Sequence, residues 1–524
     1  MAGTNLCMIH LEMVPKDAQR RTYRDGELSD DLDNIVFPWG SLTKMVVIVA
    51  LSVIIDELAV SNLSENERFK SLRGAWDRPF VECFNKVSKA RMSNLLYNVK
   101  VGELATHYRG IPPINHIIMA PDGTPLMSND DFLAVASHLA ADAYGQSEAH
   151  SSRWNYSNGN AILIGMFIEA AYGKPLPKVV EELVFRRFGM RSAYMGTKHD
   201  PDAALPHEAS GGETVPIESP QTLSDPLCIA AMGVRSNAND IATFFRSIVT
   251  TFPDEPGGDL RPTIMSCLLG RRVNMEGGRY YPCGVFTTLD TTIPGLQSLN
   301  RLTSPESSSY VLGSKQPGNK PVEVCYSTGR INGFEACTYI IPSFRTFLIV
   351  QANTSGRVDA CDHISRLILQ SSFDLRPSSG PRVDIPAMVK QGVEEGVELL
   401  AEFTQSQSVH DDDSAIPSNH LVGTYTHDRY RQTFLVTERE GKLWVRWQGS
   451  RIAEGHPVQS GEMQLLRVTA HLVRMKVRFN VDRLDAWRDL DFRVSRDGNR
   501  QVVSLCRENP YIENNSITYV RSPD

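Results

Sequence analysis

The most apolar stretch of the chain covers residues 45–55, where only Ser52 interrupts the run before it ends at Asp56. The preceding Pro38-Trp39-Gly40 is typical of a turn. The pattern therefore predicts a turn followed by a buried helix over residues 41–60. The run is shorter than the roughly 20 residues that a helix needs to cross a bilayer, so we expect no membrane insertion.

Elsewhere the spacing of apolar positions changes along the chain. Helical spacing predicts a helix ending at Gly173 and others over residues 129–144, 177–188, 239–252, 358–370 and 386–403. Strand patterns occur at residues 6–14, 322–326, 334–341 and 346–352. The polar residues 15–34 predict a hairpin turn and loop, and the Pro-, Gly- and Ser-rich residues 197–226 predict an ordered loop. Short β-rich runs fill the C-terminal part, at residues 421–425, 433–437, 442–447, 465–468 and 474–481.

The order of these elements indicates the fold class. One strand, then many helices, then several strands and a helix favour an α+β domain with an antiparallel sheet and an inserted helical cluster, over residues 1–375. A helix and a polar connector follow at 376–419, where Asp411-Asp412-Asp413 is typical of a solvated linker. Residues 420–524 predict a small all-β domain, either a sandwich or a barrel.

Composition excludes several classes of function. The 524 residues carry a net charge of −7, which argues against nucleic acid as the main partner. The nine cysteines are scattered without a Cys-x-x-Cys pair, and the histidines show no ligand spacing, so we expect neither a metal site nor a disulfide framework. The N-terminus lacks the pattern of a secretory signal, and a cytoplasmic protein is the expectation. No cofactor is indicated.

The start of the apolar helix holds the first candidate for catalysis. Ser41 and Lys44 are three residues apart, so their side chains would share one helical face in the first turn. A lysine beside the apolar wall would lose solvation, which disfavours its charged form and makes it a proton acceptor for the serine. The alternative is an N-cap serine with a solvated lysine on a core helix.

Two later stretches have compatible chemistry. Tyr156-Ser157-Asn158 precedes a predicted helix, where a phenol can relay a proton and an amide can bind substrate. Ser327-Thr328-Gly329-Arg330 lies between two predicted strands, where small residues let an acyl group approach and backbone N–H groups can face an oxyanion. Taken singly, the first stretch could be a helix cap and the second a hairpin turn.

Together, in this order, the three stretches resemble the motifs of the serine β-lactamase and penicillin-binding-protein-like superfamily. The similarity is to its class C β-lactamase, esterase and D-aminopeptidase branch, whose motifs are Ser-x-x-Lys, Tyr-x-Asn and a Lys/His-Thr/Ser-Gly strand. Residues 421–425 look like the start of the lipocalin-like domain of many members, including fungal-type ones. The resemblance implies a β-lactamase/transpeptidase-like domain followed by a lipocalin-like domain.

The resemblance also implies roles for individual residues. Ser41 would be the acylated nucleophile, Lys44 and Tyr156 would share general-base work, and Asn158 would bind substrate. Ser327, Thr328, Gly329 and Arg330 would line the substrate site, with the backbone N–H groups of Ser41 and Arg330 forming the oxyanion hole.

The chain departs from the family pattern at two places. Ser327 replaces the usual lysine or histidine, so the cation that grips a carboxylate is missing unless the Arg330 side chain substitutes for it, and uncharged acyl groups are favoured. Only 40 residues precede Ser41, so we expect an edge strand or the packing helix to be absent.

Three functions remain open on these residues. The first is a serine hydrolase that cleaves an ester or amide of a small molecule through an acyl-enzyme. The second is an acyltransferase of the same fold in secondary metabolite biosynthesis, as in fungal small-molecule pathways. The third is a non-catalytic binding protein on the same scaffold. The acyl substrate, the acceptor and the oligomeric state do not follow from the sequence.

Overall fold

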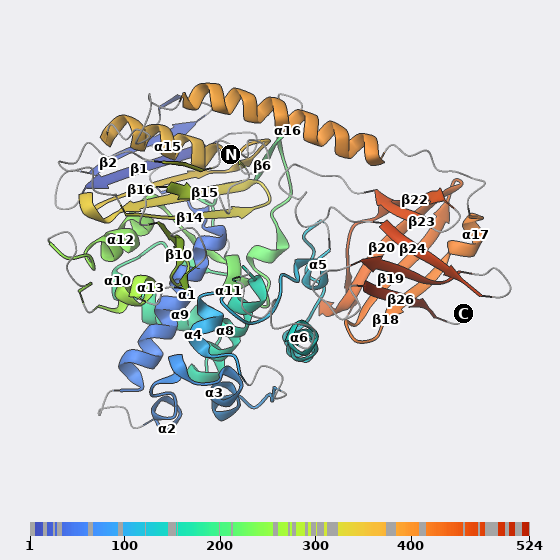
Figure 1. Ribbon diagram of the computed structural model, residues 1–524, viewed down its shortest axis with the longest axis horizontal. Coiled ribbons are helices and arrows are strands. Elements are labelled where there is room, and N and C mark those ends of the chain that lie inside the picture. The colour runs from blue at the N-terminus through green and yellow to red at the C-terminus, as the bar shows by residue number, and fades with distance from the viewer. Residues whose placement is uncertain are drawn as a thin grey trace. The chain divides into compact units, whose positions relative to one another are not determined.

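The computed structural model divides the chain into two compact units (Figure 1). The first unit comprises residues 1–91, 97–109 and 160–397, and the second comprises residues 92–96, 110–159 and 398–524. In this division residues 110–159 group with the C-terminal region. The structure describes residues 6–13, 18–24, 27–28, 34–60, 66–92, 98–120, 122–144, 154, 156–196, 198, 200–210, 213–254, 260–261, 263–270, 273–274, 279–288, 292–294, 300, 309–311, 323–373, 384–407, 416–453, 456–469, 472–476, 491–497, 502–508 and 516–522.

An antiparallel sheet is the centre of the first unit, with strand order β3-β2-β1-β16-β15-β14-β11-β10-β9. Four of the strands are the predicted ones, and β1 pairs with β16 so that the start of the chain meets residues far along it. These four strands are β1 (Leu6–Met13), β14 (Val324–Ile331), β15 (Phe334–Ile341) and β16 (Thr346–Ala352). The shorter strands on the far side are β9 (Val273–Asn274), β10 (Arg279–Tyr281) and β11 (Phe286–Thr288).

The opposite edge of this sheet refines two expectations. Residues 15–34, expected to be a hairpin turn and loop, contain β2 (Ala18–Arg24) and β3 (Glu27–Leu28). Strand β2 pairs with β1, so edge strands are present before Ser41. Of the two alternatives, an absent edge strand or an absent packing helix, the first was wrong, and the described residues before Ser41 contain no helix ahead of η1 (Gly40–Leu42). The sequence of β2 is polar and rich in arginine, which suits a strand near a sheet edge but hides the alternation that would have predicted it.

Helices pack on both faces of the sheet (Figure 1). On one face, α15 (Ala360–Phe373) packs against β15 and β16. On the other, α12 (Ala238–Val249) packs against β1 and β16, and its N-terminus is capped by the Asn237 side chain. The predicted apolar helix begins as the single turn η1 (Gly40–Leu42), continues as α1 (Thr43–Ser52) and ends in a wider turn over Val53–Leu58. All residues of α1 are buried, which is why the segment is apolar on every side.

Further helices in this unit are α3 (Phe80–Val87), α4 (Val101–Ala105), α8 (Asn158–Tyr172), α9 (Leu176–Val180), α10 (Arg186–Phe188) and α11 (Ile229–Met232). The unit includes α8 from residue 160 onward, and α9 and α11 pack against α1. The end of α8 and the bounds of α9 with α10 are close to those predicted. Residues 197–226 are not only a loop, because β6 (His207–Ser210) and β7 (Glu213–Pro216) form a hairpin there. The predicted helix after the sheet is α16 (Ile385–Gln407).

The C-terminal region of the second unit is a closed antiparallel barrel. Its strands follow the order β19-β18-β26-β25-β24-β23-β22-β20, and β20 pairs back with β19 to close the ring. Phe434, Trp447, Phe492 and Tyr519 fill its core. The structure thus decides between the sandwich and the barrel, and the fold is consistent with a lipocalin-like domain. The strands are β18 (Gly423–His427), β19 (Gln432–Arg439), β20 (Lys442–Ala453), β22 (Met463–Thr469), β23 (Leu472–Lys476), β24 (Asp491–Arg496), β25 (Val502–Glu508) and β26 (Ser516–Arg521), with β21 (His456–Gln459) beside β20.

Residues 110–159 complete the second unit. They contain α5 (Asn115–Ile118) and α6 (Asn129–Tyr144), the latter with the predicted bounds. The predicted Asp411-Asp412-Asp413 connector and the end of the last predicted strand, residues 477–481, lie outside the described residues.

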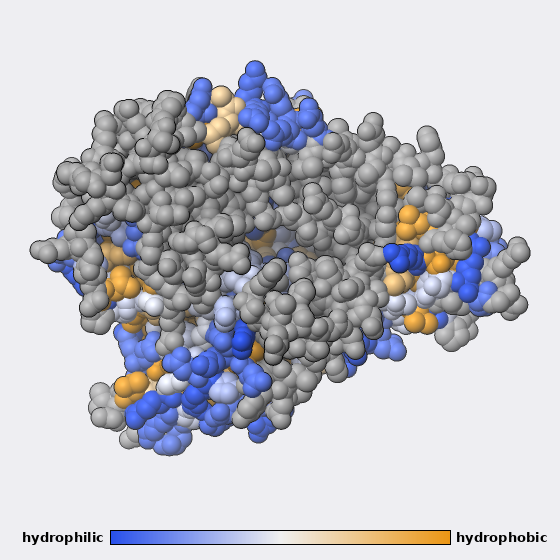
Figure 2. All heavy atoms as spheres, viewed as in Figure 1, coloured by the Kyte–Doolittle hydropathy of each residue, from blue (hydrophilic) through white to orange (hydrophobic). Residues whose placement is uncertain are grey.

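The described surface is mainly hydrophilic on the face shown in Figure 2, above all over α2 (Glu67–Lys70) and α3. Apolar side chains occur there in small separate groups, as is usual for a protein surface. Within the described ranges, no helix combines the length and the apolar character required to cross a bilayer.

Candidate active site

The turn before α1 fixes the position of Ser41. Trp39 is fully buried, and its Nε1 donates to Ser236 Oγ at 2.8 Å while its backbone N–H donates to Val234 O at 2.9 Å. Gly40 has φ +52°, and a Cβ there would lie 2.8 Å from the backbone nitrogen of Arg330. Glycine is therefore needed both for the backbone angle and for the close approach to β14.

Lys44 is directed at the Ser41 hydroxyl. Its Nζ donates to Ser41 Oγ at 3.1 Å and to the carbonyl oxygen of Ala231, in α11, at 3.0 Å. The Lys44 side chain is 4% exposed, whereas Ser41 is half-buried. The spacing of three residues on one helical face thus places an amine and a hydroxyl in hydrogen-bond contact.

Burial sets the protonation of this amine. It lowers the pKa of Lys44 from 10.5 to about 7, because the charged form loses its hydration. Near neutral pH a large fraction of Lys44 is therefore uncharged. A neutral amine within hydrogen-bond distance of a serine hydroxyl can accept its proton.

His107 lies beside Lys44, a residue to which the sequence assigned no role. The two side chains line a cavity of about 10 Å³, which is room for about one water molecule. Burial, and secondarily the charge of Lys44, lower the pKa of His107 to about 3, so the imidazole is neutral. It also adopts φ 54° and its ring contacts that of Tyr281 at 5.4 Å between centroids. No spacing signal in the sequence marks this residue, because its partners come from distant segments.

The third stretch lies within a strand rather than in a turn. Residues 327–330 are part of β14, which ends at Ile331, and Asn332 and Gly333 turn the chain into β15. A Cβ at Gly329 would lie 2.0 Å from Trp39 O, so this face of β14 is directed at the nucleophile turn. Ser327 shares that face, because side chains alternate along a strand.

Thr328 and Arg330 lie on the opposite face of β14. The cross-strand partner of Arg330 is Glu335, and Arg330 Nη2 donates to Glu335 Oε1 at 3.4 Å. On β15, this face also carries Tyr339, which bonds to α15. The Arg330 guanidinium is therefore directed away from Ser41. It does not replace the missing cation at position 327, although the Arg330 backbone nitrogen lies beside Gly40.

Tyr156 and Asn158 belong to the second unit. Asn158 is the first residue of α8, and its Nδ2 donates to Asn115 Oδ1 at 3.0 Å. Ser157 forms the cap: its Oγ accepts from the backbone N–H of Gly159 at 3.2 Å. Tyr156 is half-buried, with its ring 6.3 Å from that of Trp154. The first unit thus brings together Ser41, Lys44 and the 327–330 strand, while the second carries the Tyr-x-Asn pair.

In the part of the chain that the structure describes, no three His, Cys, Asp or Glu side chains gather in a way that could hold a metal ion.

A family model described as Beta-lactamase matches residues 33–370, which is more than half of the chain and includes all three stretches. The chain belongs to the beta-lactamase family. Members of this family are generally serine hydrolases, and a Ser-x-x-Lys serine is their nucleophile.

Individual relatives are distant. The chain is 22% identical over 485 residues to the unguisins hydrolase ungD' of Aspergillus campestris, covering 90% of this chain and 80% of that protein. Among solved structures, an octameric penicillin-binding protein homologue from Pyrococcus abyssi matches with a TM-score of 0.48 and 14% identity over 98% of this chain and 95% of that chain. A D-stereospecific amidohydrolase from Streptomyces sp. matches with a TM-score of 0.47 and 17% identity, covering 70% of this chain and 94% of that chain.

Proposed function

We propose that this protein is a serine hydrolase that cleaves an ester or amide of a small molecule through an acyl-enzyme on Ser41. The observation that carries the proposal is the contact of 3.1 Å between Lys44 Nζ and Ser41 Oγ, made by an amine whose pKa burial lowers to about 7. A purely structural lysine gains nothing from this arrangement, because burying its charge costs free energy.

The chemistry proceeds in two steps. Neutral Lys44 takes the Ser41 proton as Oγ attacks the carbonyl carbon of the substrate, and the carbonyl electrons move to its oxygen. Collapse of this intermediate expels an alcohol or amine, which takes a proton as it leaves, and water then hydrolyses the acyl-enzyme. The backbone N–H groups of Ser41 and Arg330 are proposed to hold the oxyanion. Removing one such donor typically costs about 3 kcal/mol of transition-state stabilisation.

The Tyr156 and Asn158 roles follow from the family resemblance. Tyr156 is proposed to share the proton transfer with Lys44, and Asn158 to bind the substrate. In support of the second role, Asn158 Oδ1 is buried and accepts no hydrogen bond from the described residues. Buried acceptors are normally satisfied, so this oxygen is suited to an N–H donor of a ligand.

The substrate class follows from the 327–330 strand. Ser327 occupies the place of a cation, and the Arg330 guanidinium is turned to the other face, where it contacts Glu335. We therefore propose an uncharged acyl group rather than one with a carboxylate beside the scissile bond. The name of the Aspergillus campestris relative, a hydrolase, supports water over an alcohol or amine as the acceptor. All nine cysteines are free thiols, which supports a reducing, cytoplasmic location.

The first experiment is labelling with a fluorophosphonate probe. Wild type is expected to be modified and Ser41→Ala not. Ser71→Ala, a serine of the same unit that bonds only to a local carbonyl, is the matched control and should label like wild type. Equal labelling of Ser41→Ala would mean that another residue reacts with the probe and would remove Ser41 as the nucleophile. No labelling of wild type would also remove Ser41 and would favour a binding protein.

Product analysis then separates hydrolysis from transfer. Neutral p-nitrophenyl esters are incubated with and without added alcohols and amines, and the acid and any new ester or amide are quantified. Hydrolysis predicts one acid per p-nitrophenol released whatever is added. Tyr156→Phe is expected to lower the acylation rate by about 10²-fold or more, and a near-normal rate would exclude Tyr156 from the mechanism.

A further inference from the structure

The segment that precedes the Tyr-x-Asn pair is attached to the C-terminal barrel by contacts at four places. The first is a buried amide. Gln432 of β19 is 1% exposed, and its Nε2 donates to the backbone oxygen of Ile117, in α5, at 2.7 Å. Its Oε1 accepts from Tyr519 Oη of β26 at 2.8 Å. One side chain thus joins α5 to two strands of the barrel, and losing it would leave buried polar groups unsatisfied.

Strand β20 makes the second attachment. The Arg451 backbone N–H donates to Leu126 O at 3.0 Å, and a Cβ at Gly449 would lie 1.8 Å from the same oxygen. Only glycine permits this backbone-to-backbone approach. Residue 126 is therefore seated directly on the strand.

Two acidic side chains complete the attachment. Asp122 Oδ2 accepts from the backbone N–H of Gly461 at 2.6 Å, and Asp131 at the start of α6 pairs with Arg431 of the barrel. The contacted positions 117, 122, 126 and 131 lie at intervals along residues 117–131, so the barrel holds this part of the segment at several points.

The same segment also contacts the residues around Asn158, through residues 111–115. Asn115, two residues before Ile117 in the single turn of α5, accepts from the Asn158 side chain at 3.0 Å. Pro112 O accepts from Ser157 Oγ at 3.1 Å. A Cβ at Gly159 would lie 3.2 Å from the Ile111 side chain, so the backbone here is also closely packed. Residues 157–159, directly after Tyr156, thus rest on residues 111–115.

We propose that the barrel is a positioning domain for catalysis: Gln432 fixes α5, and α5 in turn fixes Asn158 and the adjacent Tyr156. The proposal rests on the function proposed above and gives a role to the C-terminal domain. Its physical basis is that α5 is only four residues long and therefore has little stability of its own. Its geometry depends on what it is bonded to, and the buried bond to Gln432 supplies that support.

The test uses full-length protein and an isosteric change. Gln432→Glu keeps the acceptor for Tyr519 but replaces the donor to Ile117 with a carboxylate. Gln459→Glu is the matched control, because Gln459 is an exposed barrel glutamine whose side chain bonds to Gln448. We expect Gln432→Glu to slow fluorophosphonate labelling of Ser41 by about tenfold and Gln459→Glu by less than about twofold.

A double-mutant cycle separates positioning from general damage. If the barrel acts through Tyr156 and Asn158, Gln432→Glu should slow labelling much less in a Tyr156→Phe background than in wild type. Effects that multiply in the double mutant would overturn the proposal. Asp122→Asn, which weakens an exposed contact, is the second variant and should slow labelling by about two- to threefold with the same non-additivity.

Hydrogen exchange tests the attachment without any activity. Backbone amides of residues 111–118 and 156–160 should exchange faster in Gln432→Glu than in Gln459→Glu, while the fluorescence of Trp447 in the barrel core stays unchanged. Unchanged exchange would overturn the proposal. Failure of wild type to label would instead count against Ser41 as nucleophile, so the two failures are distinguishable.

Discussion

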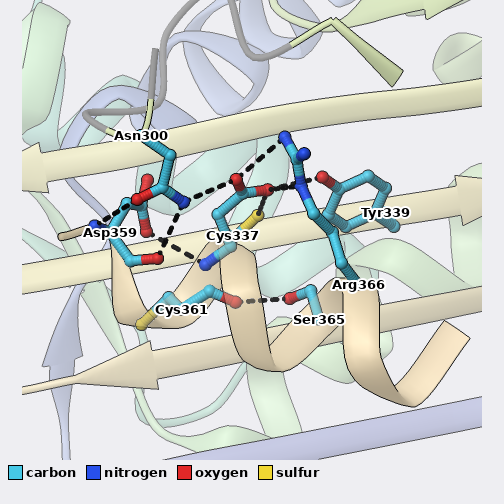
Figure 3. Close-up of polar contacts among 8 residues, drawn as sticks. Asn300, Cys337, Tyr339, Asp359, Cys361, Ser365 and Arg366 are labelled. Atoms are coloured by element: carbon cyan, nitrogen blue, oxygen red, sulfur yellow. Dashed lines mark hydrogen bonds and ion pairs between the residues drawn. The ribbon is translucent and has the colours of Figure 1, made fainter. Parts of the chain in front are cut away.

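Two buried cations lie on opposite sides of the central sheet, and their surroundings differ. Lys44, on the α1 side, donates to two neutral oxygens, Ser41 Oγ and Ala231 O. Arg366, on α15, is 0% exposed and faces a carboxylate: its Nη2 lies 2.9 Å from Asp362 Oδ2, and its Nε donates to Oδ1 at 3.0 Å (Figure 3). Burial disfavours the charged form of both side chains, and the Asp362 carboxylate offsets this for the arginine.

The Asp362 carboxylate is also held by neutral donors. Tyr339 Oη donates to its Oδ1 at 2.5 Å, and Asn300 Nδ2 donates to its Oδ2 at 3.0 Å (Figure 3). Burial alone would raise the pKa of this carboxyl, but the Arg366 charge and the Tyr339 hydroxyl outweigh it and hold the pKa below the ordinary value. The cluster therefore stays ionised and joins α15 to β15.

The two faces of the sheet therefore hold buried basic side chains of different kinds: Arg366 keeps its charge, and Lys44 can lose a proton. A buried cation next to a buried anion keeps its charge and holds elements together, whereas a buried amine next to a hydroxyl and a carbonyl becomes titratable near neutral pH. We infer that the α15 face stabilises the fold and that the α1 face carries the reaction.

The largest effect is expected from Lys44→Met, which keeps the length and removes the amine. Acylation of Ser41 should fall by about 10²- to 10⁴-fold, because the proton acceptor is lost. The free energy of unfolding at pH 7 should not decrease, because no desolvated charge remains. Lys86→Met, at a half-exposed surface lysine, is the control and should label normally. A large loss of stability in Lys44→Met would make Lys44 a structural cation like Arg366.

Asp362→Asn should lower stability and leave the labelling of Ser41 unchanged. Removing one partner leaves Arg366 buried beside a neutral group, and the free energy of unfolding in urea should fall by about 3–5 kcal/mol. Labelling of the remaining folded protein should keep its rate. Glu82→Gln, which breaks surface pairs with Arg78 and Lys86, should cost less than about 1 kcal/mol. A similar small cost for Asp362→Asn would contradict the structural role of the cluster.

Tyr339→Phe removes only one hydroxyl from the same cluster. Because that hydroxyl donates to an ionised carboxylate, we expect a loss of about 1.5–3 kcal/mol in the free energy of unfolding. Thermal and urea unfolding measure the loss. Labelling of Ser41 should be unaffected, and a slower rate would show that the two faces of the sheet are coupled.

The pH dependence of stability tests the protonation of Lys44 directly. The pKa of Lys44 is about 7 when folded and near 10.5 in the unfolded chain, so the unfolded chain binds more protons between these values. Stability of wild type relative to Lys44→Met should therefore rise between pH 7 and 10, by at most about 1.4 kcal/mol per pH unit, and be flat below pH 6. Urea unfolding of both proteins across this range measures it. A flat difference above pH 7 would mean that the Lys44 pKa is ordinary.

Local patterns in the sequence determined much of the fold. The apolar run after Gly40, the periodic helices and the β-rich strands were predicted near their observed bounds. A helix or strand that buries one face has apolar residues at a regular spacing, and this spacing can be seen in the sequence. Ser41 and Lys44 were likewise paired by spacing alone, since a helix fixes the separation of residues three apart. The polar strand β2 was missed because an edge strand leaves no such period.

Only the tertiary structure decided the chemistry of these residues. The pKa of Lys44 is lowered by burial. Part of this burial comes from α11, whose Ala231 lies 187 residues further along the chain. Pairing with β15 decides on which face of β14 the Arg330 side chain lies. The grouping of residues 110–159 with the barrel depends on contacts between residues up to 339 positions apart. Desolvation, strand pairing and domain attachment are set by neighbours in space, which a one-dimensional pattern does not record.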